Sequence, residues 1–224
     1  MIEVIPAIIP KNYKQVHDDV AQVKDYVKTV QIDVMDGEYA PEPSWPYNGV
    51  DFPQFRALVD QNEGLPYWEL IDFEIDMMTL HPEEKIDDWI SVGAKTLIIH
   101  KHSTDDETLE KIFERCSERG VEVALALKPS TPNEELAPFI EHTAFIQCMG
   151  NDKIGFHGVA LDPSVLDKIR DLKERFGDIP VGVDIGVNFE TAPGIIEAGA
   201  TRLVSGSAIY GSDDIHWAVE RLKA

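Results

Sequence analysis

The sequence is poor in cysteine and contains no long apolar run. Its 224 residues include two cysteines, Cys116 and Cys148, whose spacing fits neither a metal site nor a disulfide framework. No apolar stretch is long enough to cross a bilayer. The first residues, Met1-Ile2-Glu3-Val4, lack the basic start and apolar block of a signal peptide. These absences predict a cytoplasmic protein with free thiols.

Positive charge is also scarce. Lysine and arginine number 20 against 41 aspartates and glutamates, which gives a formal net charge of -21. Such a charge argues against nucleic acid and against an anionic membrane as partners, because both require a basic face. A small phosphorylated substrate stays compatible, since backbone N–H groups at the start of a helix can hold a phosphate locally.

Strand-like and helical patterns alternate eight times along the chain. Several strand-like segments are continuous apolar runs, such as Thr96-Leu97-Ile98-Ile99, which is typical of parallel strands buried on both faces. Strands are expected at residues 3–9, 30–35, 68–78, 96–100, 121–127, 144–149, 181–184 and 202–205. Helices are expected at residues 13–27, 52–60, 82–91, 105–119, 133–140, 163–176, 189–198 and 213–222.

Eight such units without a break in composition predict an α/β fold, a single (β/α)8 TIM barrel domain over residues 1–224. An open doubly wound sheet is disfavoured, because the turn after the first strand, Pro10-Lys11-Asn12, has no glycine. The long loop at residues 37–51 is interpreted either as a cover for the barrel mouth or as a surface linker.

Catalytic groups of a (β/α)8 barrel lie at the carboxyl ends of its strands. Asp33 and Asp184 come from the carboxyl-terminal parts of the second and seventh strands, which lie on opposite sides of a barrel mouth. Two facing carboxylates could take a proton from one face of a carbon and return one to the other face, which is the chemistry of an epimerisation. Asp36, beside the turn at Gly37, is interpreted as a helix N-cap.

Two glycine-rich turns follow the last two strands, where barrels of this kind often bind phosphate. They are Asp184-Ile185-Gly186-Val187-Asn188 and Ser205-Gly206-Ser207-Ala208-Ile209. Glycine lets the backbone approach an anion, and a serine hydroxyl adds a donor. The predicted phosphate ligands are Gly186, Gly206 and Ser207.

Over nearly its whole length the sequence resembles the ribulose-phosphate 3-epimerase family of ribulose-phosphate-binding barrels. The most specific shared element is Ile32-Asp33-Val34-Met35-Asp36-Gly37, whereas Gly206-Ser207-Ala208-Ile209 is common to many phosphate-binding barrels. The other shared elements are Pro6-Ala7-Ile8, Met78 with His81-Pro82-Glu83, Gly93-Ala94, Pro129-Ser130-Thr131-Pro132, Val183-Asp184-Ile185-Gly186-Val187 and Gly199-Ala200.

In that family a divalent metal is held by His and Asp on strand 2, His on strand 3 and Asp on strand 7. The two aspartates also form the acid–base pair, and the metal stabilises a cis-enediolate. The resemblance assigns the aspartate positions to Asp33 and Asp184, and the histidine positions to Gln31 and Asp76. It assigns the methionines that wall the site to Met35, Met78 and Met149.

The chain departs from the family pattern at several positions. Both histidine ligands are replaced, the strand 1 serine is Ala7, and Lys128 stands where the family tends to have Asn. The loop after strand 6 keeps Gly155 and Gly158 as further phosphate contacts, with His157 between them as another. Lys128 and His100 are predicted pocket residues. The alternative for His100, at the end of strand 4, is a purely structural hydrogen bond.

The set Gln31, Asp33, Asp76 and Asp184 offers only oxygen ligands, which favours Mg2+ or Mn2+ over Zn2+. A metal-free site with one protonated carboxyl is the alternative.

We therefore predict a sugar-phosphate isomerase that epimerises C3 of a ketopentose phosphate by acid–base catalysis. The alternatives are a non-catalytic phosphosugar-binding protein and another phosphate-binding barrel enzyme, such as a lyase or decarboxylase. The decarboxylase branch is disfavoured because Asp33-Val34-Met35-Asp36 lacks its lysine. The expected partner is a small sugar phosphate, and the resemblance implies a homo-oligomer.

Overall fold

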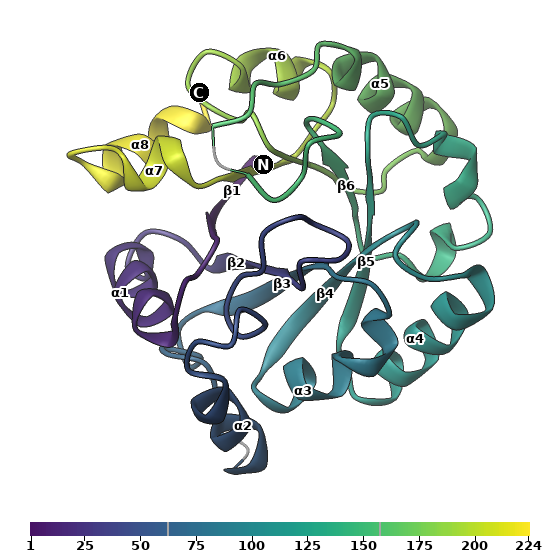
Figure 1. Ribbon diagram of the computed structural model, residues 1–224. Coiled ribbons are helices and arrows are strands. Elements are labelled where there is room, and N and C mark those ends of the chain that lie inside the picture. The colour runs from purple at the N-terminus through teal and green to yellow at the C-terminus, as the bar shows by residue number, and fades with distance from the viewer. Residues whose placement is uncertain (62, 157) are drawn as a thin grey trace. The chain divides into compact units, whose positions relative to one another are not determined.

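The described residues, 1–61, 63–156 and 158–224, form eight parallel strands that close into a barrel in chain order (Figure 1). The computed structural model thus confirms the expected (β/α)8 barrel. The strands are β1 (Glu3–Ile8), β2 (Thr29–Met35), β3 (Asp72–Met78), β4 (Ala94–His100), β5 (Glu122–Leu127), β6 (Ile146–Met149), β7 (Val181–Asp184) and β8 (Arg202–Ser205).

In the described chain an α-helix follows each strand except β5, which is followed by 3-10 turns. The α-helices are α1 (Tyr13–Val23), α2 (Phe52–Gln61), α3 (Ile86–Ser91), α4 (Asp106–Glu118), α5 (Ser164–Phe176), α6 (Ala192–Glu197), α7 (Ser207–Tyr210) and α8 (Ile215–Leu222). Short 3-10 turns occur at Pro82–Glu84, Asn133–Leu136 and Ile140–His142. None of the helices in the described ranges combines the length and the apolar character that a membrane span requires.

Two compact units make up the chain, and each is described by itself. The first, which we call the N-terminal unit, comprises Ala7–Val123. Within it β2, β3 and β4 are adjacent and parallel, and helices α1 to α4 lie on their outer side (Figure 1). Buried side chains on α1 recur at helical spacing, at Val16, Val20 and Val23. This unit carries Gln31, Asp33, Asp76 and His100.

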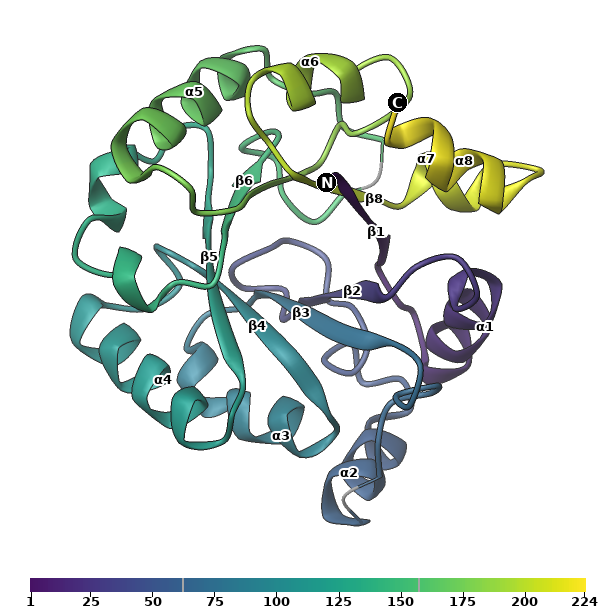
Figure 2. The same ribbon diagram turned by 180° about the vertical axis from the view of Figure 1, so that it is seen from behind.

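The second unit, which we call the C-terminal unit, comprises Met1–Pro6 and Ala124–Ala224. Figure 2 shows the first strand of the chain beside the last: Glu3 is the register partner of Arg202, and Pro6 that of Ser205. β6 pairs with β7 and β7 pairs with β8, also in parallel. This unit carries Asp184 and the glycine-rich turns after β7 and β8.

Two expected elements are wrong in part. The third strand begins at Asp72 rather than at residue 68, because residues 66–70 form turns in which Ile71 N donates to Tyr67 O at 3.0 Å. The helix expected at 133–140 is replaced by two 3-10 turns. Pro138 explains that break, because proline inside an α-helix removes a backbone donor and clashes with the preceding turn.

The loop at residues 37–51 is anchored within the N-terminal unit. Trp45 is fully buried, and its ring centroid lies 5.3 Å from that of Phe55 and 6.0 Å from that of Trp89. Ser44 Oγ donates to the carbonyl of Asp33 at 2.9 Å and accepts from Met35 N at 3.0 Å. The loop therefore packs against β2 and is not an exposed surface linker.

Candidate active site

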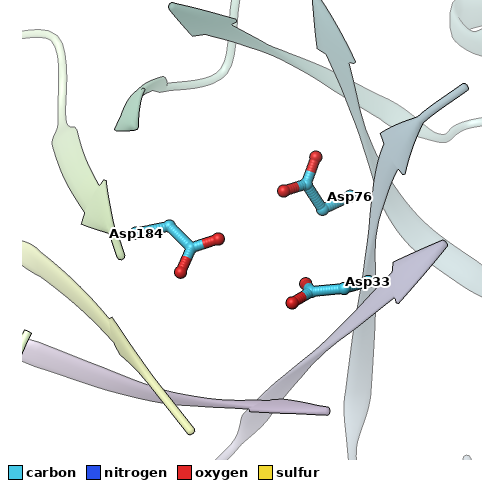
Figure 3. A group of neighbouring side chains, drawn as sticks. All are labelled: Asp33, Asp76 and Asp184. Atoms are coloured by element: carbon cyan, nitrogen blue, oxygen red, sulfur yellow. The ribbon is translucent and has the colours of Figure 1, made fainter. Parts of the chain in front are cut away.

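Asp33 and Asp76 form an acidic pair within the N-terminal unit. They are register partners on β2 and β3, and both side chains are buried. The two carboxylates project to the same side of their strands, with ligand oxygens within 4.8 Å of each other (Figure 3). Because two negative charges at this distance repel, the pair requires hydrogen-bond donors or a cation around it.

Each of these two carboxylates has a polar partner on a neighbouring side chain. Gln31 Nε2 donates to Asp33 Oδ1 at 2.7 Å, and His100 Nε2 lies 2.9 Å from Asp76 Oδ1. Gln31 is fully buried and His100 is 1% exposed. A buried polar side chain therefore contacts each carboxylate of the acidic pair.

Tyr39, from the loop after β2, covers the imidazole of His100. The two ring centroids are 5.2 Å apart and the rings meet edge to face at 63°. Burial raises the pKa of the Tyr39 phenol, and the negative charge of Asp76 raises it further. The phenol is therefore a neutral group near the acidic pair, and the sequence analysis did not identify it.

Asp36 has a structural role that differs from the expected N-cap. Its Oδ1 accepts from the backbone N–H groups of Glu38 at 2.9 Å and Tyr39 at 3.0 Å, and its Oδ2 accepts from Leu80 N at 2.8 Å. No helix begins at this turn in the described chain, so the N-cap interpretation is wrong. The carboxylate instead ties the loop after β2 to the loop after β3.

Met35 and Met78 lie on the same face as the acidic pair. They are register partners two residues beyond Asp33 and Asp76, and alternate residues of a strand share a face. Both are buried. Ala7, where the resembled family has serine, is the register partner of Gln31. The N-terminal unit thus brings together six of the expected site residues: Gln31, Asp33, Met35, Asp76, Met78 and His100.

Asp184 is the last residue of β7 in the C-terminal unit, and its register partner is Met149. Both side chains are buried. Asp184 Oδ1 accepts from Ile185 N at 2.7 Å, and its backbone carbonyl accepts from Gly150 N at 2.5 Å. The carboxylate is thereby oriented by its own following turn.

That turn is strained. Ile185 has φ 80°, a left-handed conformation that is an outlier for a β-branched residue. Gly186 follows with φ 75°, and a Cβ there would lie 2.4 Å from Leu161 N. Glycine is therefore required at 186 by packing against the loop after β6, whatever ligand the turn binds.

The other expected phosphate residues also lie in the C-terminal unit. Gly206 immediately precedes α7, and Ser207 is the exposed first residue of that helix. Gly155 and Gly158 lie in the loop between β6 and α5, both at positive φ. His157 lies outside the described residues. Lys128 follows β5 and is half-buried.

Three buried carboxylates, those of Asp33, Asp76 and Asp184, are candidate metal ligands in the described part of the chain (Figure 3). Their donor atoms are all oxygen, and the amide oxygen of Gln31 would add another. Carboxylate and carbonyl oxygens suit hard divalent cations, whereas zinc prefers nitrogen and sulfur. The donor chemistry therefore fits Mg2+ or Mn2+ better than Zn2+.

A (β/α)8 barrel with buried carboxylates at the carboxyl ends of its strands has the arrangement in which barrel enzymes keep their catalytic groups. Comparison with known proteins shows to which family of barrel proteins the chain belongs. The chain belongs to the ribulose-phosphate 3 epimerase family, whose family model matches residues 3–210.

Individual relatives agree with this assignment. The chain is 30% identical over 229 residues to a ribulose-phosphate 3-epimerase of Bacillus subtilis, an alignment that covers 100% of this chain and 99% of the relative. A Schizosaccharomyces pombe ribulose-phosphate 3-epimerase is 26% identical over 209 residues, with coverages of 93% and 86%. Among solved structures, 3-hexulose-6-phosphate synthase from Salmonella typhimurium superposes with a TM-score of 0.70 at 14% identity, over 99% of this chain and 96% of that one. That likeness shows the shared fold.

Proposed function

We propose that the protein is a sugar-phosphate isomerase that inverts C3 of a ketopentose phosphate such as ribulose 5-phosphate. The observation that carries the proposal is the placement of Asp33 and Asp184. Each is a buried carboxylate at the carboxyl end of a barrel strand, in a chain of the ribulose-phosphate 3 epimerase family. Burial of a charged carboxylate is costly unless the group is hydrogen-bonded, paired with an opposite charge or bound to a metal.

In the proposed reaction, Asp33 and Asp184 act as an acid–base pair. One carboxylate takes the proton from C3, and the other, which starts protonated, gives a proton to the opposite face of the same carbon. The C3–H bond breaks on one face and forms again on the other, so the configuration inverts. Exchange of the aspartate protons with solvent then restores the starting state.

Asp33, Asp76 and Asp184, with the amide oxygen of Gln31, would hold a divalent cation, with Mg2+ or Mn2+ favoured by the oxygen donor set. Such a cation would stabilise the negative charge that develops on the substrate oxygens as the C3 proton leaves. The family match supports this part of the proposal.

The rest of the proposed site binds and encloses the sugar phosphate. Backbone N–H groups at Gly186, Gly206 and Ser207, with the loop at Gly155 and Gly158, would contact the phosphate. The proposed pocket residues are Met35, Met78, Met149 and Lys128, together with His100, which adjoins the site through its contact with Asp76. A homo-oligomer stays a prediction, as does a cytoplasmic location, for which the two buried free thiols, Cys116 and Cys148, are the supporting observation.

The test is proton exchange at C3. The purified protein is incubated with ribulose 5-phosphate in D2O, and the C3 proton is followed by NMR. We expect the wild-type protein to remove that signal, and Asp33→Asn and Asp184→Asn each to slow its loss by about 10²–10⁴-fold. Asp213→Asn, an exposed aspartate on the same chain, is the matched control and should exchange at the wild-type rate.

The outcomes separate the competing functions. Binding of ribulose 5-phosphate by calorimetry without any C3 exchange would support a phosphosugar-binding protein instead. Exchange that survives in both aspartate variants would refute the assigned roles. Exchange that is indifferent to EDTA and to added Mg2+ or Mn2+ would refute the cation and leave the acid–base pair intact.

A further inference from the structure

The hydrogen bond between Asp76 and His100 joins two fully buried side chains of the N-terminal unit. Asp76 is 0% exposed and His100 is 1% exposed, and Nε2 of the ring lies 2.9 Å from Oδ1 of the carboxylate. An ionised carboxylate can only accept a hydrogen bond. With Asp76 ionised, as a ligand of a divalent cation would be, the imidazole presents its Nε2–H to the carboxylate.

Among the described residues, the contact with Asp76 is the one hydrogen bond that orients this ring. Nδ1 of His100 is buried and has no hydrogen-bond partner among the described residues. The backbone carbonyl of His100 is held by Ser103, whose N and Oγ donate to it at 2.9 Å and 2.8 Å. Tyr39 packs edge to face against the ring. The ring is thus held by packing and directs its one described side-chain hydrogen bond at Asp76.

We propose that His100 is a positioning residue, which fixes the carboxylate of Asp76 in the orientation that holds the divalent cation. The proposal rests on the proposed function, because His100 is said to orient Asp76, which is a ligand of the proposed cation site. Many metal sites have an imidazole on the metal and a carboxylate behind it, which orients the ring. Here the order is inverted, with the carboxylate toward the site and the imidazole behind.

The physical need for such a residue follows from the neighbouring charge. The oxygens of Asp33 and Asp76 lie within 4.8 Å of each other. A carboxylate that could rotate freely would turn away from its like-charged neighbour when no cation is present. The His100 hydrogen bond holds one oxygen in place, so the orientation is set before the cation arrives and less free energy is lost on binding.

The test measures Mn2+ binding to the purified full-length chain by isothermal titration calorimetry, together with the melting temperature without metal. His100→Leu removes the donor, whereas His100→Gln keeps an N–H group on a side chain of similar reach. Removing a residue that orients a metal ligand typically costs about 10–100-fold in metal affinity. We expect that loss in His100→Leu and affinity within about threefold of wild type in His100→Gln.

A double-mutant cycle separates positioning from a purely structural role. If His100 acts through Asp76, then His100→Leu should cost no further Mn2+ affinity once Asp76→Asn is present. A structural role would lower the melting temperature of His100→Leu with unchanged Mn2+ affinity. Long-range ¹H–¹⁵N NMR of the metal-free protein gives a second readout, with the ring proton expected on Nε2.

Three results would overturn the proposal: a wild-type chain that binds no Mn2+, a folded His100→Leu variant with wild-type Mn2+ affinity, or additive effects in the cycle. Failure of the proposed function looks different. In that case C3 exchange is absent, while Mn2+ binding still depends on His100 through Asp76.

Discussion

The side-chain amide nitrogen of Gln31 lies 2.7 Å from Oδ1 of Asp33, two residues further along the same strand. Gln31 occupies the position at which the family resemblance expects a histidine metal ligand. The amide N–H group of Gln31 donates a hydrogen bond to the neighbouring carboxylate. A histidine nitrogen bound to a metal could not do so. We expect this bond to hold the Asp33 carboxylate in its reactive orientation.

Gln31→Met tests that expectation, because methionine is similar in length but carries no N–H donor. We expect kcat/KM for C3 epimerisation to fall about 10–100-fold, as is typical when a residue that orients a site carboxylate is lost. Gln54→Met, at an exposed position in α2, is the matched control and should keep wild-type kinetics. Unchanged kcat/KM in a folded Gln31→Met variant would contradict the role.

Metal preference provides a separate prediction. The double substitution Gln31→His with Asp76→His introduces two nitrogen ligands at the positions where the resemblance leads us to expect histidine. We expect the ratio of Zn2+ to Mg2+ affinity to rise, since imidazole suits zinc and carboxylate oxygens suit magnesium. Competition calorimetry with both cations measures the ratio. A ratio equal to that of the wild-type chain would indicate that these positions do not face the cation.

The sequence predicted the elements that depend on periodicity. The apolar runs of β4 and β5 and the acidic strand end at Asp33 were identified because burial on both faces and a polar strand end leave direct marks in the residue order. The side chain that contacts Asp76 was not predictable from the sequence. His100 is 24 positions away along the chain, and only the folded chain brings its ring within 2.9 Å of Asp76 Oδ1.

Two loop residues near the site, Ser44 and Tyr39, were missed for a similar reason. Ser44 and Tyr39 sit in a loop without periodicity, so no pattern signals that one holds the Asp33 carbonyl and the other covers His100. Asp36 was misinterpreted because a carboxylate beside a glycine turn is typical of an N-cap. Its real partners include Leu80 N, 44 positions away. Long-range partners of this kind are set by topology, which local sequence does not encode.

Ser44→Ala should destabilise the protein without removing any candidate site residue. The hydroxyl is buried, donates to the Asp33 carbonyl and accepts from Met35 N. Leaving a buried backbone donor unsatisfied costs about 1–3 kcal/mol, so we expect the free energy of unfolding to fall by that amount. Urea denaturation measures it. Ser130→Ala, whose hydroxyl bonds an exposed aspartate, should change stability by less than about 0.5 kcal/mol.

Ile185→Gly should stabilise the protein. Isoleucine at φ 80° is strained, and the left-handed region costs a residue with a Cβ roughly 1–2 kcal/mol. Glycine removes that strain. It also increases the conformational entropy of the unfolded chain, which lowers the stabilisation in part. We expect a net gain of about 0.5–1 kcal/mol in the free energy of unfolding. Ile185→Val keeps the β-branch and should show no gain, and equal stabilities of the two variants would contradict the strain.

The buried thiol of Cys148 should make the free energy of unfolding fall at alkaline pH. Burial raises the pKa of this thiol from 9.0 to about 12, with a smaller opposing effect from the positive charge of Lys168. Below pH 9 the thiol is protonated in both the folded and the unfolded states, so its contribution to stability is fully present. As the pH rises above 9, the unfolded chain loses this proton while the folded chain keeps it, and stability falls until the pH passes about 12.

The measurement compares wild type with Cys148→Ala by urea denaturation at pH 8 and pH 10. Between these values the wild-type chain should lose about 1.4 kcal/mol more than the variant, because the unfolded thiol titrates near pH 9 and one pKa unit corresponds to that free energy. Cys116→Ala should give a similar difference, since burial raises the pKa of that thiol to about 11, still above the upper pH. If the free energy of unfolding changed equally with pH in wild type and Cys148→Ala, the thiol would have the same pKa in the folded and unfolded chains, which would contradict the prediction.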